Sequence, residues 1–253
     1  MDLASSPARR DALYFIVGPS FVALAAAAAF KIDPWPVPIP SQAQLLDPVT
    51  VGVTLLFGLG GVLLSNRAGL PSAPSVRETA QWRRLLGVAV GSGLLFGIAL
   101  FGYDSATGLT AQAAKALGAS WINVPLPQSL AHYAAAAILL ECIYRIVPIT
   151  ILGWLIGRIM LRGRADGWVF WILAVLTSLI EPASQLGLAH PGSVAALATL
   201  LVVTFAANIF EAIELRRYGW PAPVLFRLAF YGVWHCLGPY FVSSQSVLYP
   251  GPH

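Results

Sequence analysis

The most conspicuous candidates for a functional role in this sequence are two opposite charges inside an apolar run. Glu141 and Arg145 lie four residues apart in a segment that is otherwise apolar from Tyr133 to Arg158. In a helix this spacing places both side chains on one face, one turn apart. If the helix spans a membrane, each charge costs roughly 3 kcal/mol unless it faces the protein interior and has a partner. The spacing therefore predicts a paired, inward-facing carboxylate and guanidinium.

Further along the chain, three more polar groups interrupt apolar segments. They are Glu181, Gln185 one turn beyond it, and His235. A carboxylate or an imidazole can take a proton from water, and an amide can donate a hydrogen bond to a developing oxyanion. At 1.5 Å per residue, Glu141, Glu181 and His235 would each lie about 12 Å from the outer end of their helices. We therefore expect these three groups to share one depth and to form a candidate site with Arg145 and Gln185.

The composition predicts which elements position these groups. Of 253 residues, 57% are hydrophobic and only 10% are charged, whereas a soluble domain has roughly 25% charged residues. The chain is therefore predicted to be a polytopic membrane protein, with no room for a separate soluble domain. The net charge of +4 does not indicate nucleic-acid binding, because the basic residues lie in short connections between apolar runs. Cys142 and Cys236 are expected to be free, buried thiols.

Seven apolar segments are long enough to suggest spans. The first resembles a signal peptide in its basic start and apolar stretch, but we expect it to remain as a span. A short helix is expected between spans three and four, over Thr110–Gly118, with Gly118 as its cap. The predicted spans are about 12–30, 49–64, 85–102, 133–157, 168–188, 194–213 and 224–242.

Lysine and arginine are distributed unevenly between the two sides of this arrangement. Alternate connections hold eleven arginines on one side and two lysines on the other. Because cytoplasmic connections carry the excess of basic residues, the N-terminus is predicted inside and the C-terminus outside. The eleven are Arg9, Arg10, Arg67, Arg77, Arg83, Arg84, Arg158, Arg162, Arg164, Arg216 and Arg217, against Lys31 and Lys115.

Three stretches in the second half of the chain resemble motifs of one known family. Leu140 to Arg145 is similar to Glu-Glu-x-x-x-Arg, Thr177 to Gln185 falls where Phe-x-x-x-His should follow, and His235 to Pro239 is similar to His-x-x-x-Asn. These are the motifs of the CPBP intramembrane proteases, the group of the type II CAAX prenyl endopeptidases. The resemblance covers about residues 133–245 and implies an endopeptidase whose last four spans enclose a conical cavity.

The sequence also departs from that family at positions that its chemistry needs. Leu140 stands where the family has its water-activating glutamate, and Gln185 stands where it has the second-motif histidine. Glu181 replaces the phenylalanine of that motif, and Pro239 replaces the final asparagine. The resemblance therefore carries over Glu141, Arg145 and His235, and leaves Glu181 as the one available substitute base.

Structural roles are open for the same residues. Glu141 and Arg145 can form an ion pair that fixes packing, and His235 can be a neutral, hydrogen-bonded core residue. Glu181 precedes Pro182, which removes a helical hydrogen bond and is expected to kink span five. A metal site of Glu141, Glu181 and His235 lacks any recognised ligand spacing. Arg227 is expected to extend to the interface, and Glu211 and Glu214 to form a helix-end cluster with Arg216 and Arg217.

The predicted fold is an all-α bundle of about seven transmembrane helices. Residues 1–132 would form spans one to three with their loops, and residues 133–253 a CAAX-protease-like core, within one membrane domain. Two hypotheses of function stand: an intramembrane endopeptidase acting on a peptide or lipidated protein, or a catalytically silent subunit that holds a protein, lipid or pigment partner in a complex. The expected location is the lipid bilayer of a bacterial inner membrane, and the sequence assigns no cofactor.

Overall fold

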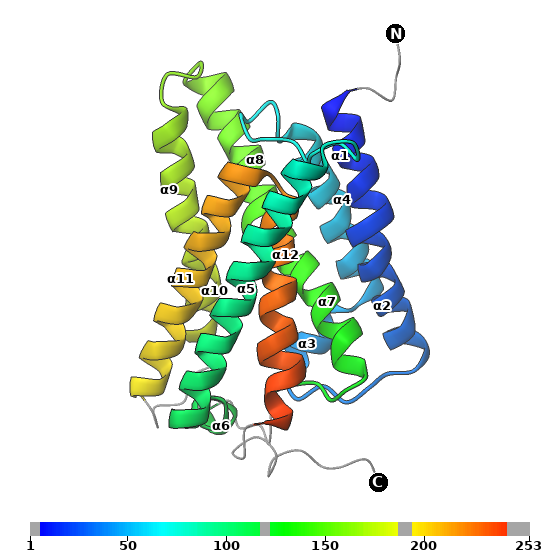
Figure 1. Cartoon of the computed structure of the whole chain (residues 1–253), viewed down its shortest axis with the longest axis vertical. Helices are drawn as coiled ribbons and strands as arrows, with labels where there is room; N and C mark the ends of the chain where they lie inside the picture. The colour runs from blue at the N-terminus through cyan, green and yellow to red at the C-terminus, as the bar shows by residue number, and fades with distance from the viewer. Residues whose placement is uncertain (1–5, 117–121, 187–193, 242–253) are drawn as a thin grey trace.

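A computed structural model describes residues 6–116, 122–186 and 194–241, and this part of the chain is helical, with no strand (Figure 1). The α-helices are α1 (Pro7–Phe15), α2 (Phe21–Ile32), α3 (Pro40–Leu45), α4 (Pro48–Leu64), α5 (Thr79–Thr107), α6 (Leu109–Ala116), α7 (Gln128–Glu141), α8 (Val147–Leu152), α9 (Asp166–Ser178), α10 (Ile180–Leu186), α11 (Val194–Tyr218) and α12 (Pro221–Tyr231). Four π-helical turns and one 3₁₀ turn join or extend them: η1 (Ile16–Ser20), η2 (Cys142–Ile146), η3 (Gly153–Met160), η4 (Gly232–Leu237) and η5 (Gly238–Tyr240). The all-helical prediction is confirmed for the described residues.

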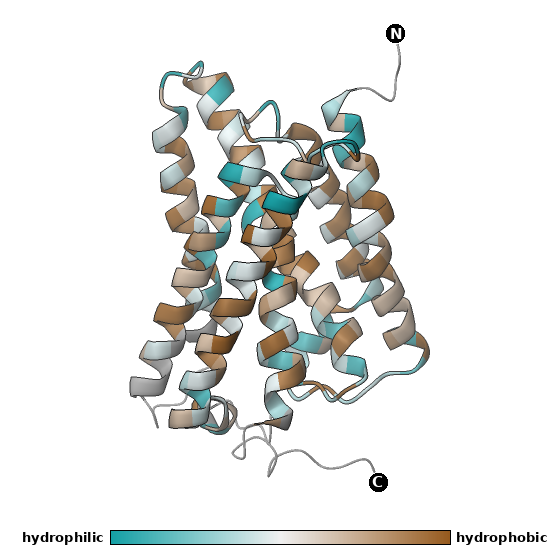
Figure 2. Ribbon diagram, viewed as in Figure 1, coloured by the Kyte–Doolittle hydropathy of each residue, from teal (hydrophilic) through white to brown (hydrophobic). Residues whose placement is uncertain are grey.

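Among these residues, four continuous helical runs are long and apolar enough to cross a membrane. They are Pro7–Ile32, Thr79–Thr107, Gln128–Met160 and Asp166–Ser184. The helix α4 is apolar but shorter. Hydrophobic residues colour most of the length of the long helices in Figure 2, which fits a lipid environment. The chain is therefore a membrane protein by the length and composition of its helices.

Helix boundaries extend past the predicted apolar segments. The helix α5 begins at Thr79 rather than at residue 85, and α7 begins at Gln128 rather than at Tyr133. Hydropathy locates the hydrocarbon layer, whereas a helix continues until a cap ends it. Before α5, the backbone N–H of Ser75 donates to the Glu78 carboxylate at 2.5 Å, and this hydrogen bond lowers the pKa of Glu78. The predicted short helix is present as α6, while Gly118 lies outside the described residues.

Prolines account for two interruptions of the long helices. Pro148 has no N–H to bond the carbonyl of Tyr144, and the π-helical turn η2 ends two residues before it, at Ile146. Pro182 likewise leaves the carbonyl of Ser178 without its helical partner, and the regular helix breaks at Leu179, between α9 and α10. A break in the regular helix therefore lies where the kink in span five was predicted.

The helix α12 lies inside the bundle, where α5, α7 and α11 pack against it. It contacts α5 along its length and also contacts α7 and α11 (Figure 1). Helices from the first half of the chain cover the side of α7 and α8 that faces away from α12. The helix α2 packs on α7, and α4 packs on η2 and α8. Side chains from segments far apart in sequence therefore meet at the level of η2 and the middle of α12.

Candidate functional site

A buried network of charged and polar side chains occupies the centre of the bundle. Its members come from five helical elements and contact one another directly. They are Glu141 of α7, Arg145 of η2, Glu181 of α10, Asn208 and Glu211 of α11, and Arg227 and Tyr231 of α12. We call this set the charged network.

The pair predicted from spacing is present in the network. Arg145 Nη1 lies 3.3 Å from Glu141 Oε1, and both side chains are buried, at 1% and 0% exposed. Arg145 also donates to Asn208 and to Glu211. The i,i+4 relation thus supplies one contact of Arg145, and α11 supplies its contacts with Asn208 and Glu211.

Arg227 lies at the centre of the network, so the expectation that it extends to the membrane interface was wrong. Its side chain is 3% exposed, and its Nε donates to Glu141 at 2.7 Å and to Glu211 at 3.0 Å. Its terminal nitrogens bond Glu181 at 3.2 Å and Tyr231 at 2.9 Å. The correction follows from the fold: α12 begins at Pro221, so Arg227 lies almost two turns inside the helix and faces the bundle.

The expected helix-end cluster of Glu211 and Glu214 was also wrong. The helix α11 continues to Tyr218, so Glu211 lies two turns from its end and is fully buried against Arg145 and Arg227. Glu214 is buried as well, and it accepts a hydrogen bond from Ser92 of α5 at 3.1 Å. Arg216 instead lies over the ring of Phe170, 4.5 Å from its centroid.

Glu181 is the most accessible carboxylate of the network. It is 15% exposed, and it accepts hydrogen bonds from Arg227 at 3.2 Å and from Asn208 at 3.1 Å. A carboxylate bound to a guanidinium in this way is stabilised as an anion, which opposes its use as a base. The side chain of Gln185 lies outside the described residues.

His235 is in a separate, aromatic environment. Its Nδ1 lies 2.5 Å from Asn123 Oδ1, and its ring stacks on Tyr133 with centroids 4.3 Å apart. Tyr231 and Trp234 pack against the same ring. His235 follows Arg227 by eight residues, about 12 Å along a helix. Of the three groups expected to converge at one depth, Glu141 and Glu181 therefore share Arg227, whereas His235 packs against Tyr231, which accepts a hydrogen bond from Arg227.

A second histidine belongs to this aromatic environment and was not among the predicted site residues. Trp35 Nε1 donates to His132 Nδ1 at 3.4 Å, and His132 packs edge-on against Tyr133. The aromatic rings thus fill the space between α7, α12 and the segment before α3.

Neither a metal site nor a reactive thiol is formed by the described residues. No group of His, Cys, Asp and Glu within them is arranged to hold a metal ion. Cys142 and Cys236 are free and buried, as predicted. Burial in apolar surroundings keeps a thiol protonated and inert.

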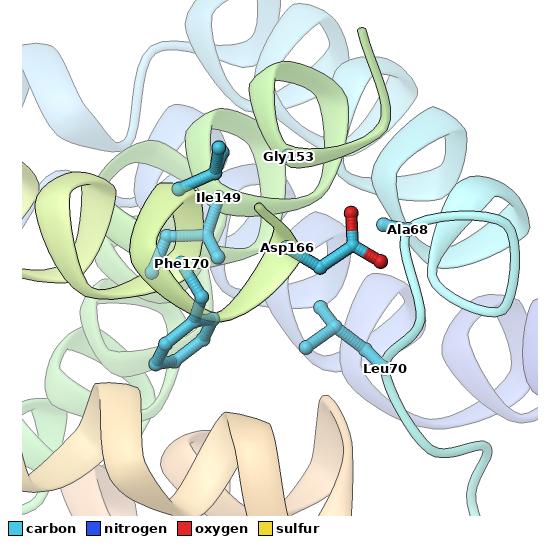
Figure 3. A pocket seen from close by; sticks show the side chains of 7 residues that line it. Ala68, Leu70, Ile149, Gly153, Asp166 and Phe170 are labelled. Carbon is cyan, nitrogen blue, oxygen red and sulfur yellow. The ribbon is translucent and has the colours of Figure 1, made fainter. Parts of the chain in front are cut away.

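A small pocket lies apart from the charged network (Figure 3). It opens between α8, η3, α9 and the segment after α4, and its walls are apolar except for Asp166. Asp166 accepts from Arg158 Nε at 3.0 Å in a partly exposed ion pair. None of the predicted site residues lines this pocket.

Comparison of the chain with protein-family models, with curated proteins and with solved structures finds no match. The chemistry of the chain must therefore be inferred from its own residues.

Four network members, Asn208, Glu211, Arg227 and Tyr231, were not predicted as site residues. A signal for them exists in the sequence, because Asn208 and Glu211 are three residues apart and Arg227 and Tyr231 are four apart, each pair on one helix face. An excess of carboxylates in apolar segments also demands a cation, which Arg227 supplies.

Proposed function

We propose that this chain is a catalytically silent member of the CAAX-protease-like class of membrane bundles, serving as a subunit of a membrane complex. The observation that supports this most is the engagement of all three network carboxylates by Arg227. A protease of this class needs a carboxylate free to activate water, together with a histidine near it. Here the carboxylates bind guanidinium groups, and the histidine is bonded to Asn123.

The packing around His235 supports the same proposal. Tyr133, Tyr231 and Trp234 lie against its ring, so this level of the bundle is filled by aromatic side chains. A peptide substrate needs an open cavity at the reacting groups. Polar groups held by ion pairs and hydrogen bonds suit a bundle that holds its shape for a partner.

We further propose seven spans, with the N-terminus inside, in a bacterial inner membrane. The ends of the helices support this topology. The connections after α4, after η3 and after α11, which carry most of the arginines, lie at the same end of the bundle as the start of α1 (Figure 1). The ends of α2 and α6, with Lys31 and Lys115 in their last turns, lie at the opposite end.

An intramembrane endopeptidase is the second candidate, and one observation favours it. Glu181 is the only carboxylate of the network with measurable exposure, 15% against 0% for Glu141 and Glu211. Loss of its bond to Arg227 would turn it into a base at the edge of the bundle.

A cleavage assay separates the two candidates. The purified chain would be reconstituted in vesicles with a library of lipidated and unlipidated peptides, beside Glu181→Gln and His235→Ala, and products would be measured by mass spectrometry. We expect no cleavage above that of protein-free vesicles in any of the three. Cleavage by the unaltered chain that disappears in both variants would overturn the silent assignment.

A separate measurement tests whether the chain is a subunit of a membrane complex. After mild detergent extraction from native membranes, the mass of the particle that contains the chain would be determined by native mass spectrometry. We expect one defined species in which the chain is present in fixed ratio to another component. A particle made of this chain and lipid alone would exclude the subunit role while leaving the cleavage result intact.

A further inference from the structure

The charged network has an unequal number of acidic and basic groups. It contains three carboxyl groups, Glu141, Glu181 and Glu211, and its ion pairs among the described residues involve two cations, Arg145 and Arg227. With every group ionised, the network would carry one net negative charge in the centre of the bundle. An uncompensated charge in a medium of low dielectric is costly, and such groups are normally neutralised by a proton or an ion.

The hydrogen bonds differ among the three carboxyl groups. Both oxygens of Glu211 accept from Arg227, at 3.0 and 2.8 Å, and Oε2 also accepts from Arg145. Both oxygens of Glu181 accept from Arg227, and Oε2 accepts from Asn208 as well. These two groups have the donors that a carboxylate requires.

Glu141 lacks that complement of donors. Its Oε1 accepts from Arg227 at 2.7 Å and faces Arg145, but its Oε2 is buried without a hydrogen-bond partner among the described residues. A buried anionic oxygen without a donor loses its full hydration energy, whereas the oxygen of a neutral carboxyl group loses much less. The missing donor therefore identifies the carboxyl group on which a proton is least costly.

Among the described residues, the elements packed against α7 contribute no further cation at this level. The helices α2 and α4 and the turn η1 have one charged residue between them, Lys31, which is exposed in the last turn of α2. The helix α12 supplies Arg227 and Tyr231, and η4 supplies His235. The neighbouring turn η2 supplies Arg145 and Tyr144.

We propose that Glu141 is a proton-binding site whose occupancy is set by the charge balance of the network. At neutral pH it holds one proton, and the network of three carboxyl and two guanidinium groups is then electrically neutral. This inference does not depend on the silent-subunit assignment, since it concerns the resting charge of the bundle.

Glu214 provides an internal reference. It is buried, accepts one hydrogen bond from Ser92 at 3.1 Å, and has no cation among its described contacts. Its charge state is not coupled through a shared guanidinium to Glu181. Substitutions at Glu141 and Glu181 should therefore leave a Glu214 signal unchanged.

Infrared spectroscopy of the purified chain in detergent tests the proposal, because the C=O stretch of a protonated carboxyl group lies apart from the carboxylate bands. In the difference spectrum between unaltered chain and Glu141→Gln, we expect the loss of one protonated carboxyl group at pH 7. Glu214→Gln should instead remove a different band, that of the Glu214 carboxyl group. A Glu141→Gln spectrum that loses a carboxylate band instead would overturn the proposal.

A second variant, Glu181→Gln, tests the charge balance while Glu141 itself stays unchanged. Glu181→Gln removes one anion, so two carboxylates then balance two guanidinium groups, and Glu141 should release its proton. We expect the Glu141 component to vanish from the protonated region, whereas Glu181→Asp, which keeps the charge, should retain it. Persistence of the component in folded Glu181→Gln would show that burial alone holds the proton and would overturn the charge-balance claim.

A bound monovalent cation is the alternative source of the missing positive charge. Spectra recorded in sodium, potassium and a bulky organic cation separate the two. We expect the protonated component to be the same in all three. Its appearance only after the small cations are removed would assign the site to a metal cation and overturn the proton assignment.

Discussion

At the scale of single residues, one guanidinium holds together carboxylates from three helices. Arg227 bonds Glu141 of α7, Glu181 of α10 and Glu211 of α11. The planar fork of arginine presents several donors in fixed directions, which a lysine ammonium on a flexible stem does not reproduce. The identity of this residue as arginine therefore matters as well as its charge.

Replacing Arg227 with alanine should destabilise the bundle by about 3–5 kcal/mol, because removal of one partner leaves buried charges uncompensated. Arg227→Lys should recover part of that loss. The measurement is thermal unfolding of the purified protein in detergent. Arg158→Ala is the matched control, since the Arg158–Asp166 pair is 44% and 31% exposed and should contribute about 0–1 kcal/mol. Equal losses in Arg227→Ala and Arg158→Ala would contradict a central role for Arg227.

Only part of the charged network could be predicted from the sequence. The contact between Glu141 and Arg145 follows from i,i+4 spacing on one helix. The contacts of Arg227 join residues 16, 46 and 86 positions apart, and no local spacing encodes them. Arg227 and Glu211 were misassigned because each lies near the edge of its apolar segment, where an exposed end is the ordinary expectation.

At the scale of elements, the approach of α5 to α12 depends on glycine. A methyl group at Gly93 would collide with the backbone carbonyl of Phe226, and one at Gly97 would lie 2.8 Å from Val233 Cβ. Small residues at such positions let membrane helices pack at close range. The helix α12, and with it Arg227, is thus held by backbone proximity on the α5 side.

Gly93→Ala should therefore destabilise the protein by about 1–3 kcal/mol through forced separation of α5 and α12. Gly91→Ala is the control two residues away, where an added Cβ meets nothing within 4 Å. That substitution should be neutral or stabilising by up to about 1 kcal/mol, since alanine favours helix over glycine. The measurement is the thermal unfolding midpoint of each variant, compared in the same detergent. A Gly93→Ala protein as stable as Gly91→Ala would show that the α5–α12 contact tolerates separation.

Elements were predicted better than their boundaries. The break near Leu179 followed from Pro182, because a missing N–H has a definite local effect. The π-helical turn η2 before Pro148 was not predicted. A proline ring clashes with the preceding helical turn, and either a π-helical turn or a kink relieves that clash, so the proline alone does not say which forms.

At the scale of the whole molecule, the two ends of the bundle differ in charge. Arginine-bearing connections gather at the end where α1 begins, and the two lysines lie in the last turns of α2 and α6 at the other end. This asymmetry is the physical basis of the proposed orientation.

Single cysteines test the orientation, after Cys142 and Cys236 have been replaced by alanine. A cysteine at Arg164 or Arg217 should react with a membrane-impermeant maleimide only after the cell is opened. A cysteine at Lys31 or Lys115 should react in intact cells. All four residues are exposed, so access to the reagent is set by the membrane side. Labelling of Lys31→Cys and Arg164→Cys from the same side would exclude the proposed topology.

The membrane class was predictable from composition, since few charges and long apolar runs leave no other stable environment. The interior arrangement was not, because hydropathy reports which segments enter the bilayer and not which faces meet. The position of α12 inside the bundle depends on glycines of α5 and aromatic residues of α7, and such complementarity appears only in three dimensions.

The long sequence separation within the charged network has a consequence for biogenesis. Glu141 precedes Arg227 by 86 residues, so during translation Arg145 is made well before the second cation of the network. We expect a nascent chain that stops at Tyr218, before α12, to expose unmatched acidic groups and to be degraded faster than the full chain in a pulse-chase experiment. Arrival of α12 would then neutralise these acidic groups and protect the chain from degradation.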